Sequence, residues 1–250
     1  MPRTLLKYIF ILSLLLPIGM ICGQSVPPNV PTNGLVAYYG FNGNANDLSG
    51  NYNHGYVRGA SLTSDRFGNP NSAYYFGGRG SNNYIRVNQD NSLNLYNTVS
   101  ISFWMMQTSS AGTIWNNNGW SGYEQNVGSD AIFTVIAKSG LSYGYSNYGG
   151  LCVYTSLSSS RQQLCDLKIS DRNGNHLNVG AQASMNCYTY GQWIHVVQVV
   201  DGNRSRVYFN GVLYTELTTA APSLYMSNNF DLYIGQQDDP SPYFTFNGYL

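Results

Sequence analysis

The feature that most limits the fold of this chain is the spacing of its apolar residues from Gly34 onward. Short runs of alternating or aromatic character recur, and clusters of Gly, Asn, Asp and Ser separate them. No stretch keeps a long helical period. Alternation over short segments bounded by turn-forming residues is typical of an antiparallel sandwich or barrel. The sequence therefore predicts an all-β protein.

The clearest predicted strands are residues 35–41, 73–76, 84–87, 99–106, 131–137, 193–200, 206–209 and 230–234. In the fourth of these, Val99, Ile101, Phe103 and Met105 point to one face, and Ser100, Ser102, Trp104 and Met106 point to the other. That strand is expected to lie inside a sheet. Trp104 and Trp193 are interpreted as core residues because both lie in strands.

Two turns are specified by their sequence. Asp201-Gly202 follows the strand at 193–200, and Asn210-Gly211 precedes a short strand at 212–214. Both dipeptides supply the positive φ angles that tight hairpins need, so three consecutive strands are expected as an antiparallel meander. Residues 107–130 are rich in Ser, Gly and Asn and are expected to form one long loop.

The composition describes a neutral, hydrogen-bonding surface. Charged residues make up 10% of the chain, against about 25% in an average soluble domain. The formal net charge is +0, so no basic face is available for a run of phosphates or an anionic membrane. The composition therefore excludes nucleic acid as the expected partner, whereas the 22 Tyr and 10 Phe supply area for a sizeable core.

The N-terminus has the shape of an export signal. Arg3 and Lys7 give a positive start, residues 9–21 are apolar, and Gly23 precedes a cleavage point. We expect a signal peptide over residues 1–23, a Pro-rich linker over 24–33 and one domain over 34–250. The protein is then secreted or at the cell surface, with no membrane insertion after signal removal. Lipidation at Cys22 is disfavoured because Ile21 precedes it.

Three cysteines follow the expected cleavage point, in a compartment where disulfides are permitted. Residues 151–156 and 163–169 read as two strands around a serine-rich turn, which would place Cys152 nearly opposite Cys165. A cross-strand disulfide needs facing β-carbons. The alternative is that Cys152, Cys165 and Cys187 are buried thiols that pack as small apolar groups.

Several segments resemble a known family. They are residues 34–55, 65–69, 72–76, 84–87, 193–197 and 208–211, and they are similar to bacterial laminin-G-like jelly-roll domains of the concanavalin A-like lectin/glucanase superfamily. The resemblance implies a two-sheet antiparallel β-sandwich that presents loops for recognition. It covers both ends of the region from Gly34 to Leu250.

The resemblance has two departures. Residues 107–190 carry no motif that matches the family. Residues 246–250 look like the start of the strand that closes the sheet beside the first strand, and the sequence stops within that motif. The expectation is a domain that is C-terminally incomplete, either as a fragment of a larger exported protein or as a sandwich lacking its final strand.

A loop at residues 42–55 concentrates oxygen donors of the kind that bind calcium. It is not an EF-hand, because the glycine and the glutamate of that motif are missing. The resemblance implies a structural Ca²⁺ site, for which Asp47 is the best candidate ligand and Asn53 the second candidate. The alternative is that these side chains build turns through hydrogen bonds to the backbone.

The sequence carries no sign of glycosidase chemistry. Catalysis of that kind needs two carboxylates a few Å apart, whereas Glu124 and Glu216 are the only glutamates and no acid pair has the required spacing. A catalytic role is therefore not expected. The histidines are scattered without a nucleophile motif or zinc spacing.

Binding is the expected function. The loop offers Trp115, Trp120 and Tyr123 among amide side chains, which suits a sugar ring. The leading hypothesis is a non-catalytic module for a polysaccharide or cell-surface glycan. The alternative is an adhesion or structural domain that binds a surface protein, because a surface rich in Tyr and Asn also suits protein recognition. A glycoside hydrolase is the weakest alternative.

Overall fold

The computed structural model describes residues 24–108 except 79 and 97, together with 132–138, 151–157, 163–170, 176–181, 189–218, 229–236 and 245–250. The regular elements among these residues are strands and one 3-10 turn, η1 (Asn91–Leu93). The prediction of an all-β fold is confirmed.

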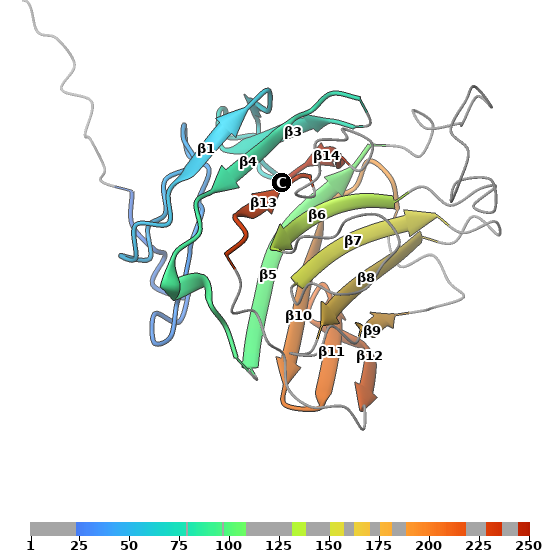
Figure 1. The fold of residues 1–250 in the computed structure, drawn as a ribbon. Helices are drawn as coiled ribbons and strands as arrows, with labels where there is room; N and C mark the ends of the chain where they lie inside the picture. The colour runs from blue at the N-terminus through green and yellow to red at the C-terminus, as the bar shows by residue number, and fades with distance from the viewer. Residues whose placement is uncertain are drawn as a thin grey trace, which may run out of the picture.

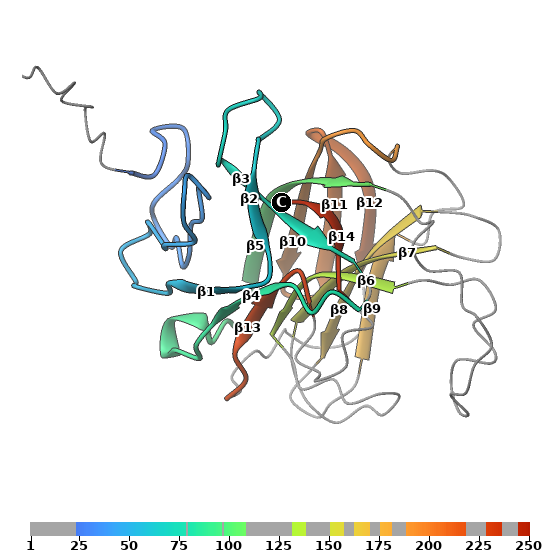
Figure 2. The same ribbon diagram turned by 90° about the horizontal axis from the view of Figure 1, so that it is seen from above.

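The strands form two layers (Figures 1 and 2). The first sheet has the order β1 (Gly55–Arg58), β4 (Tyr84–Val87), β13 (Leu232–Ile234), β6 (Ile132–Lys138), β7 (Leu151–Leu157), β8 (Gln163–Ser170) and β9 (His176–Ala181). The second has the order β12 (Val212–Thr218), β11 (Arg204–Phe209), β10 (Ile194–Asp201), β5 (Thr98–Gln107), β14 (Asn247–Tyr249), β3 (Ala73–Gly77) and β2 (Ser61–Thr63). Every pairing between these strands is antiparallel.

The core lies between the two sheets, and strands such as β4, β10 and β11 contribute alternate residues to it. Side chains with no exposed surface come from both layers and include Phe76, Ile85, Met105, Val135, Val196, Val207 and Phe246. Burial of apolar area on this scale is the main stabilising term for a sandwich. The alternation also fixes which side chains of each strand face outward.

The predictions for β5 and for the meander are confirmed. β5 lies between β10 and β14, and its residues Val99, Ile101, Phe103 and Met105 face the core. β10, β11 and β12 follow one another as antiparallel neighbours. Asn210 and Gly211 have φ angles of 49° and 81°, the pair of positive values that a tight two-residue hairpin turn uses.

The prediction of a strand at residues 35–41 is wrong. This segment contributes only an isolated bridge between Tyr39 and Asp47. Side chains of the following loop occupy its backbone groups instead, because the Asp47 carboxylate accepts from Tyr38 N and the Asn53 amide donates to Val36 O. The alternating apolar residues are present, but the backbone has no strand partner.

The two strands expected at residues 151–156 and 163–169 form as β7 and β8, and β9, which was not among the expected strands, extends the first sheet beyond them. The end of the chain differs from expectation. The final segment was expected beside the first strand, whereas β14 lies inside the second sheet and pairs with both β3 and β5.

The cysteine pair does not have the expected register. The two strands form, but Cys152 lies opposite Lys168 and Cys165 lies opposite Thr155. The two cysteines are therefore three positions apart along the ladder, which is about 10 Å of strand. A disulfide needs Cα atoms within about 7 Å, so the facing geometry that the Cys152–Cys165 bridge requires is absent from this register.

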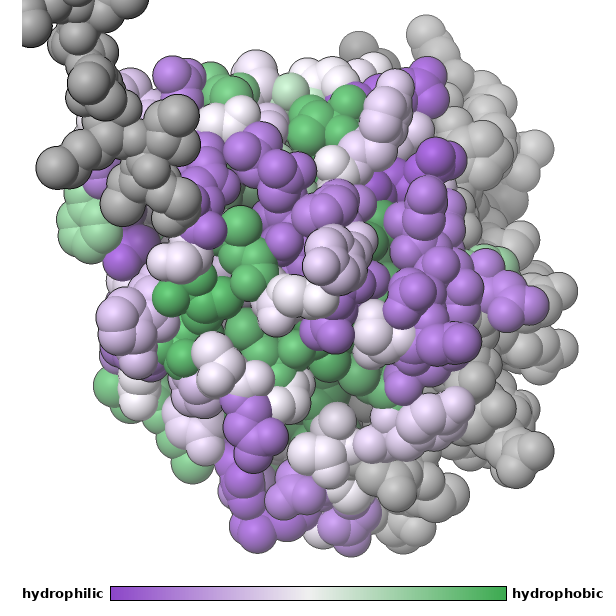
Figure 3. Space-filling model, turned by 90° about the vertical axis from the view of Figure 1, so that its left-hand side faces the viewer, coloured by the Kyte–Doolittle hydropathy of each residue, from purple (hydrophilic) through white to green (hydrophobic). Residues whose placement is uncertain are grey.

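The side of the molecule that carries β1 and β4 exposes hydrophobic residues near its middle, with hydrophilic residues around them (Figure 3). Across the described part of the chain, no helix has the length and hydropathy for a membrane crossing. The expected signal peptide, residues 1–23, lies outside the described residues.

Candidate ligand-binding face

The outer face of the second sheet carries a row of aromatic side chains. Tyr75 of β3 lies opposite Tyr249 of β14, with 5.0 Å between their ring centroids. The Trp193 ring lies 6.2 Å from Tyr249. All three side chains are partly exposed and point away from the core. The row crosses from β3 to the start of β10, so four neighbouring strands hold it in place.

A second group lies beside this row. Trp104 of β5 stacks on His195 of β10, with ring centroids 5.0 Å apart and an interplanar angle of 22°. The His195 Nε2 atom lies 2.8 Å from the Ser102 Oγ atom, which fixes the orientation of the imidazole. We call Tyr75, Trp104, Trp193, His195 and Tyr249 the aromatic face.

A loop between β2 and β3 adds two further groups. Figure 2 shows that this loop projects beyond the second sheet. The Arg66 Cζ atom lies 4.2 Å from the Trp104 ring centroid and 4.1 Å from the Phe67 ring centroid. Phe67 is 71% exposed. The result is a stack in the order Phe67, Arg66, Trp104 and His195, open to solvent at the Phe67 end.

Asp65 holds the loop in this conformation. Its Oδ1 atom accepts from the backbone N–H groups of Phe67 and Asn69, and its Oδ2 atom accepts from the Asn69 amide. Aspartate builds tight turns through such bonds to its own following backbone. The position of Arg66 over Trp104 is therefore set by local sequence as well as by the cation–π contact.

The electrostatics keep His195 neutral. Burial lowers the pKa of His195, and the positive charge of Arg66 lowers this pKa further. An imidazole whose pKa lies below the usual value of about 6.5 is uncharged at neutral pH. Arg66 is then the positive charge within the stack. The hydrogen bond between His195 and Ser102 is what a structural role for this histidine at the sheet surface requires.

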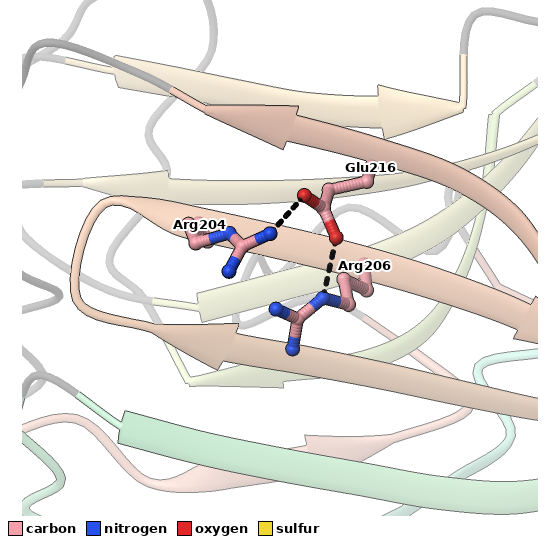
Figure 4. A network of polar contacts seen from close by, with 3 residues as sticks. All are labelled: Arg204, Arg206 and Glu216. Atoms are coloured by element: carbon pink, nitrogen blue, oxygen red, sulfur yellow. Dashed lines mark hydrogen bonds and ion pairs between the residues drawn. The ribbon is translucent and has the colours of Figure 1, made fainter.

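A charged cluster lies on the same outer face, on β11 and β12 (Figure 4). The Glu216 carboxylate is bound by Arg204 and by Arg206, the latter at 2.6 Å from Nε to Oε2. Hydrogen bonds from Arg206 and then from Arg204 lower the pKa of Glu216. A general acid in glycoside hydrolysis needs a raised pKa, so Glu216 is unsuited to that role.

The expected calcium loop is organised around Asp47. Its Oδ1 atom accepts from the N–H groups of Tyr38 and Ser49, and its Oδ2 atom accepts from Ser49 Oγ and Asn53 N. Burial raises the pKa of Asp47, but the hydrogen bonds from Tyr38, Ser49 and Asn53 outweigh this effect and lower it overall. This is the arrangement that the turn-building alternative describes.

A cation would find only part of a site here. The Asn53 Oδ1 atom is buried without a hydrogen-bond partner and fits the chemistry of a calcium ligand. Both Asp47 oxygens, in contrast, are already occupied by two donors each. The part of the chain that the structure describes contains no group of three His, Cys, Asp or Glu side chains placed to hold a metal. Calcium binding at Asp47 and Asn53 stays a prediction.

The predicted sugar-binding residues Trp115, Trp120 and Tyr123 lie outside the described residues. Their segment leaves the second sheet at Thr108, whose hydroxyl donates to the Asn247 side chain at 3.0 Å, next to the aromatic face. Their role stays a prediction.

Sequence reasoning missed the aromatic face. Trp104 and Trp193 were interpreted as core, yet both are partly exposed and neither packs in the core. The alternation in β5 was the available signal, because it had already placed Trp104 with Ser100 and Ser102 on the face opposite the apolar residues. No comparable pattern in the sequence predicts that Arg66 lies over Trp104.

The fold defines a class of protein: a two-layer antiparallel β-sandwich of the jelly-roll type, which lectin-like domains share. Residues 138–250 match a laminin-G family model described as the concanavalin A-like lectin/glucanases superfamily. The resemblance to that superfamily is thus confirmed, and it extends into the central region where no motif had been recognised. No curated protein matches the chain.

Two solved structures show the same fold at low sequence identity. Domain 4 of AbnA, an extracellular arabinanase from Geobacillus stearothermophilus, solved in complex with arabinotriose, aligns with a TM-score of 0.51 and 17% identity, over 86% of this chain and 90% of that domain. The enzymatically active domain of tailspike protein 2 from bacteriophage CBA120 aligns with a TM-score of 0.51 and 10% identity. That alignment covers 78% of this chain and 26% of the tailspike chain.

Proposed function

We propose that this chain is a secreted, non-catalytic module that binds polysaccharide on the aromatic face of its second sheet. The observation that carries the proposal is the set of partly exposed rings on adjacent strands, Tyr75, Tyr249, Trp193 and Trp104, with the Arg66–Phe67 loop beside them. Flat aromatic faces bury the apolar side of a sugar ring, and neighbouring polar groups bind its hydroxyls.

The surroundings of the face fit this ligand. Ser102 is exposed next to Trp104, and the tyrosine hydroxyls of the row supply donors and acceptors. The rings are held by a sheet and so are already in place before binding, which reduces the entropy lost when a ligand binds. The arabinanase domain of similar fold was solved with a bound trisaccharide, which supports the choice of a glycan.

The test is binding to a panel of soluble polysaccharides by affinity electrophoresis, using the whole chain and two variants. Trp104→Ala removes the ring that contacts both Arg66 and His195, so it should disorganise the aromatic face and weaken retention by about tenfold or more. Tyr56→Ala is the matched control, because Tyr56 is an aromatic that is 65% exposed on the first sheet. We expect it to bind like the wild type.

Equal retention of Trp104→Ala and wild type, or no retention of any polysaccharide by the wild type, would remove the proposal. A thermal melt of each variant shows whether it is folded. Trp115→Ala and Trp120→Ala belong in the same series, since their segment begins beside the aromatic face.

A second candidate is an adhesion domain with a protein partner. The observation in its favour lies on β12, the end strand of the second sheet, where Val212 is 70% exposed, Leu213 49% and Leu217 37%. An exposed apolar strand at a sheet edge suits pairing with another chain. Replacing Val212 and Leu213 by Thr would abolish that association and leave polysaccharide retention unchanged.

A further inference from the structure

Arg66 contacts two aromatic rings. Its Cζ atom lies 4.1 Å from the Phe67 ring centroid and 4.2 Å from the Trp104 ring centroid. A guanidinium carries five N–H donors in its plane. None of the ion pairs of the described residues includes Arg66. The neighbouring Asp65 carboxylate is occupied by Phe67 and Asn69.

The other arginines with described side chains differ in this respect. Arg58 donates to the Tyr84 hydroxyl at 3.1 Å. Arg86 lies 3.8 Å from the Asp231 carboxylate. Arg204 and Arg206 bind Glu216. The Arg86 Nε atom has no hydrogen bond but is paired with Asp231. Among the arginines with described side chains, Arg66 is therefore the one with neither an ion pair nor a hydrogen bond to a protein acceptor.

A planar fork of donors matches a carboxylate, which accepts two parallel N–H bonds from one guanidinium. The aromatic face begins at the Trp104 ring, directly beneath Arg66. A sugar ring on this face would place a substituent within reach of the Arg66 edge. Because His195 is neutral and Arg66 is charged, the stack offers one positive charge to that substituent.

We infer that the aromatic face is selective for polysaccharides whose sugar rings carry carboxylate groups, with Arg66 binding the carboxylate and the partly exposed rings of Tyr249 and Trp193 the sugar. This rests on the proposed function and names its ligand class. The cation–π stack holds the guanidinium in position without using its donors, so little side-chain entropy is lost on binding. A neutral polymer of the same backbone lacks the charge-assisted bonds and binds more weakly.

The test compares polygalacturonic acid with its fully methyl-esterified form, which keeps the same chain and removes the charge. Isothermal titration with the whole protein should show binding to the acid that is about tenfold tighter or more, as one charge-assisted bond pair predicts. This preference should shrink as salt is added.

Arg66→Gln should abolish the preference and leave binding of the ester unchanged. Arg66→Lys keeps the charge without the planar fork, so it should recover only part of the preference. Arg58→Gln is the matched control, an arginine over a tyrosine ring on the first sheet, and should match the wild type with both polymers.

The outcomes separate this inference from the proposed function. Equal affinity for both polymers, lost in Trp104→Ala, overturns the charge selectivity and leaves glycan binding standing. A preference that survives in Arg66→Gln overturns the role of Arg66, and full recovery in Arg66→Lys overturns recognition by the fork. Failure to bind these polymers and every neutral polysaccharide overturns the proposed function itself.

Discussion

Trp104 and His195 lie directly opposite each other on β5 and β10, and their rings stack at 5.0 Å on the outer face of the second sheet. This pair links the sheet to the Arg66 loop on one side and to Ser102 on the other. The pair therefore contributes both to the stability of the sheet and to the shape of the proposed binding surface.

The stack predicts an unusual titration for His195. Burial and the charge of Arg66 lower its pKa, so the folded protein binds this proton less readily than the unfolded chain. Stability from this group is complete above the unfolded pKa and falls as the pH drops through about 6.5 and below. NMR titration of the His195 ring should give a pKa below that of free histidine. Trp104→Ala should raise it toward the usual value, because the ring loses its cover.

His195→Gln is the control for stability. Its melting temperature should fall less than that of the wild type between about pH 7 and pH 5. A wild-type His195 that titrates at or above the usual value would contradict the described stack.

The Asp65 turn is predicted to matter for binding rather than for folding. Asp65→Ala removes the bonds to Phe67 and Asn69, which should loosen Arg66 over Trp104 and lower retention of polygalacturonic acid toward that of Arg66→Gln. The loop is exposed, so the melting temperature should change little.

Asp90→Ala is a fair comparison for Asp65→Ala. Asp90 caps η1 by accepting from Ser92 N in the same way, but it lies beyond β4, outside the aromatic face. We expect normal polysaccharide retention from it. If Asp65→Ala and Asp90→Ala lost polysaccharide retention equally, the position of Arg66 over Trp104 would not be the cause of the loss.

The Asp47 carboxylate is predicted to stabilise the folded state through the hydrogen bonds that it accepts. Asp47→Asn replaces one carboxylate oxygen by an NH2 group. Either the Asn53 N–H or those of Tyr38 and Ser49 then lose their acceptor. We expect a loss of about 2 kcal/mol, the usual cost of leaving a buried donor unsatisfied. Urea unfolding in the presence of a chelator measures this loss without a contribution from bound calcium.

The pH dependence gives a second readout for Asp47. Its pKa is lowered on balance in the folded state, so its contribution is present above the unfolded pKa and is lost as the pH falls below about 4. The Asn variant should lack this part of the acid-side slope. Equal slopes in both proteins would show that the carboxylate is not held as described.

The sequence predicted the elements whose partners lie close by along the chain. The meander of β10, β11 and β12 follows from alternating residues and from Asn210-Gly211, whose positive φ angles are a local property. β5 was predicted from its own alternating residues, although its partners β10 and β14 lie far along the chain. The strand expected at residues 35–41 failed because its alternation was real but its backbone partners were side chains of the Asp47 loop.

The candidate site was harder to predict. The alternation in β5 alone placed Trp104 on the face of the strand opposite the apolar residues. No local pattern, however, predicts whether that face packs against another layer or is exposed to solvent. The register of Cys152 and Cys165 shows the same limit, because it depends on strand pairing and not on the spacing between them.

What the sequence by itself determined is the all-β class, the hairpin turn at Asn210-Gly211, the neutral surface and the family resemblance, since each follows from short segments or from composition. Only the tertiary structure decided that Tyr75, Tyr249 and Trp193 form one row and that Arg66 lies over Trp104. The physical reason is that strands far apart in the chain become neighbours through backbone hydrogen bonds that any residue can make. The order and register of those strands follow from packing the whole core, so side chains on the outer face meet as a consequence of burial elsewhere.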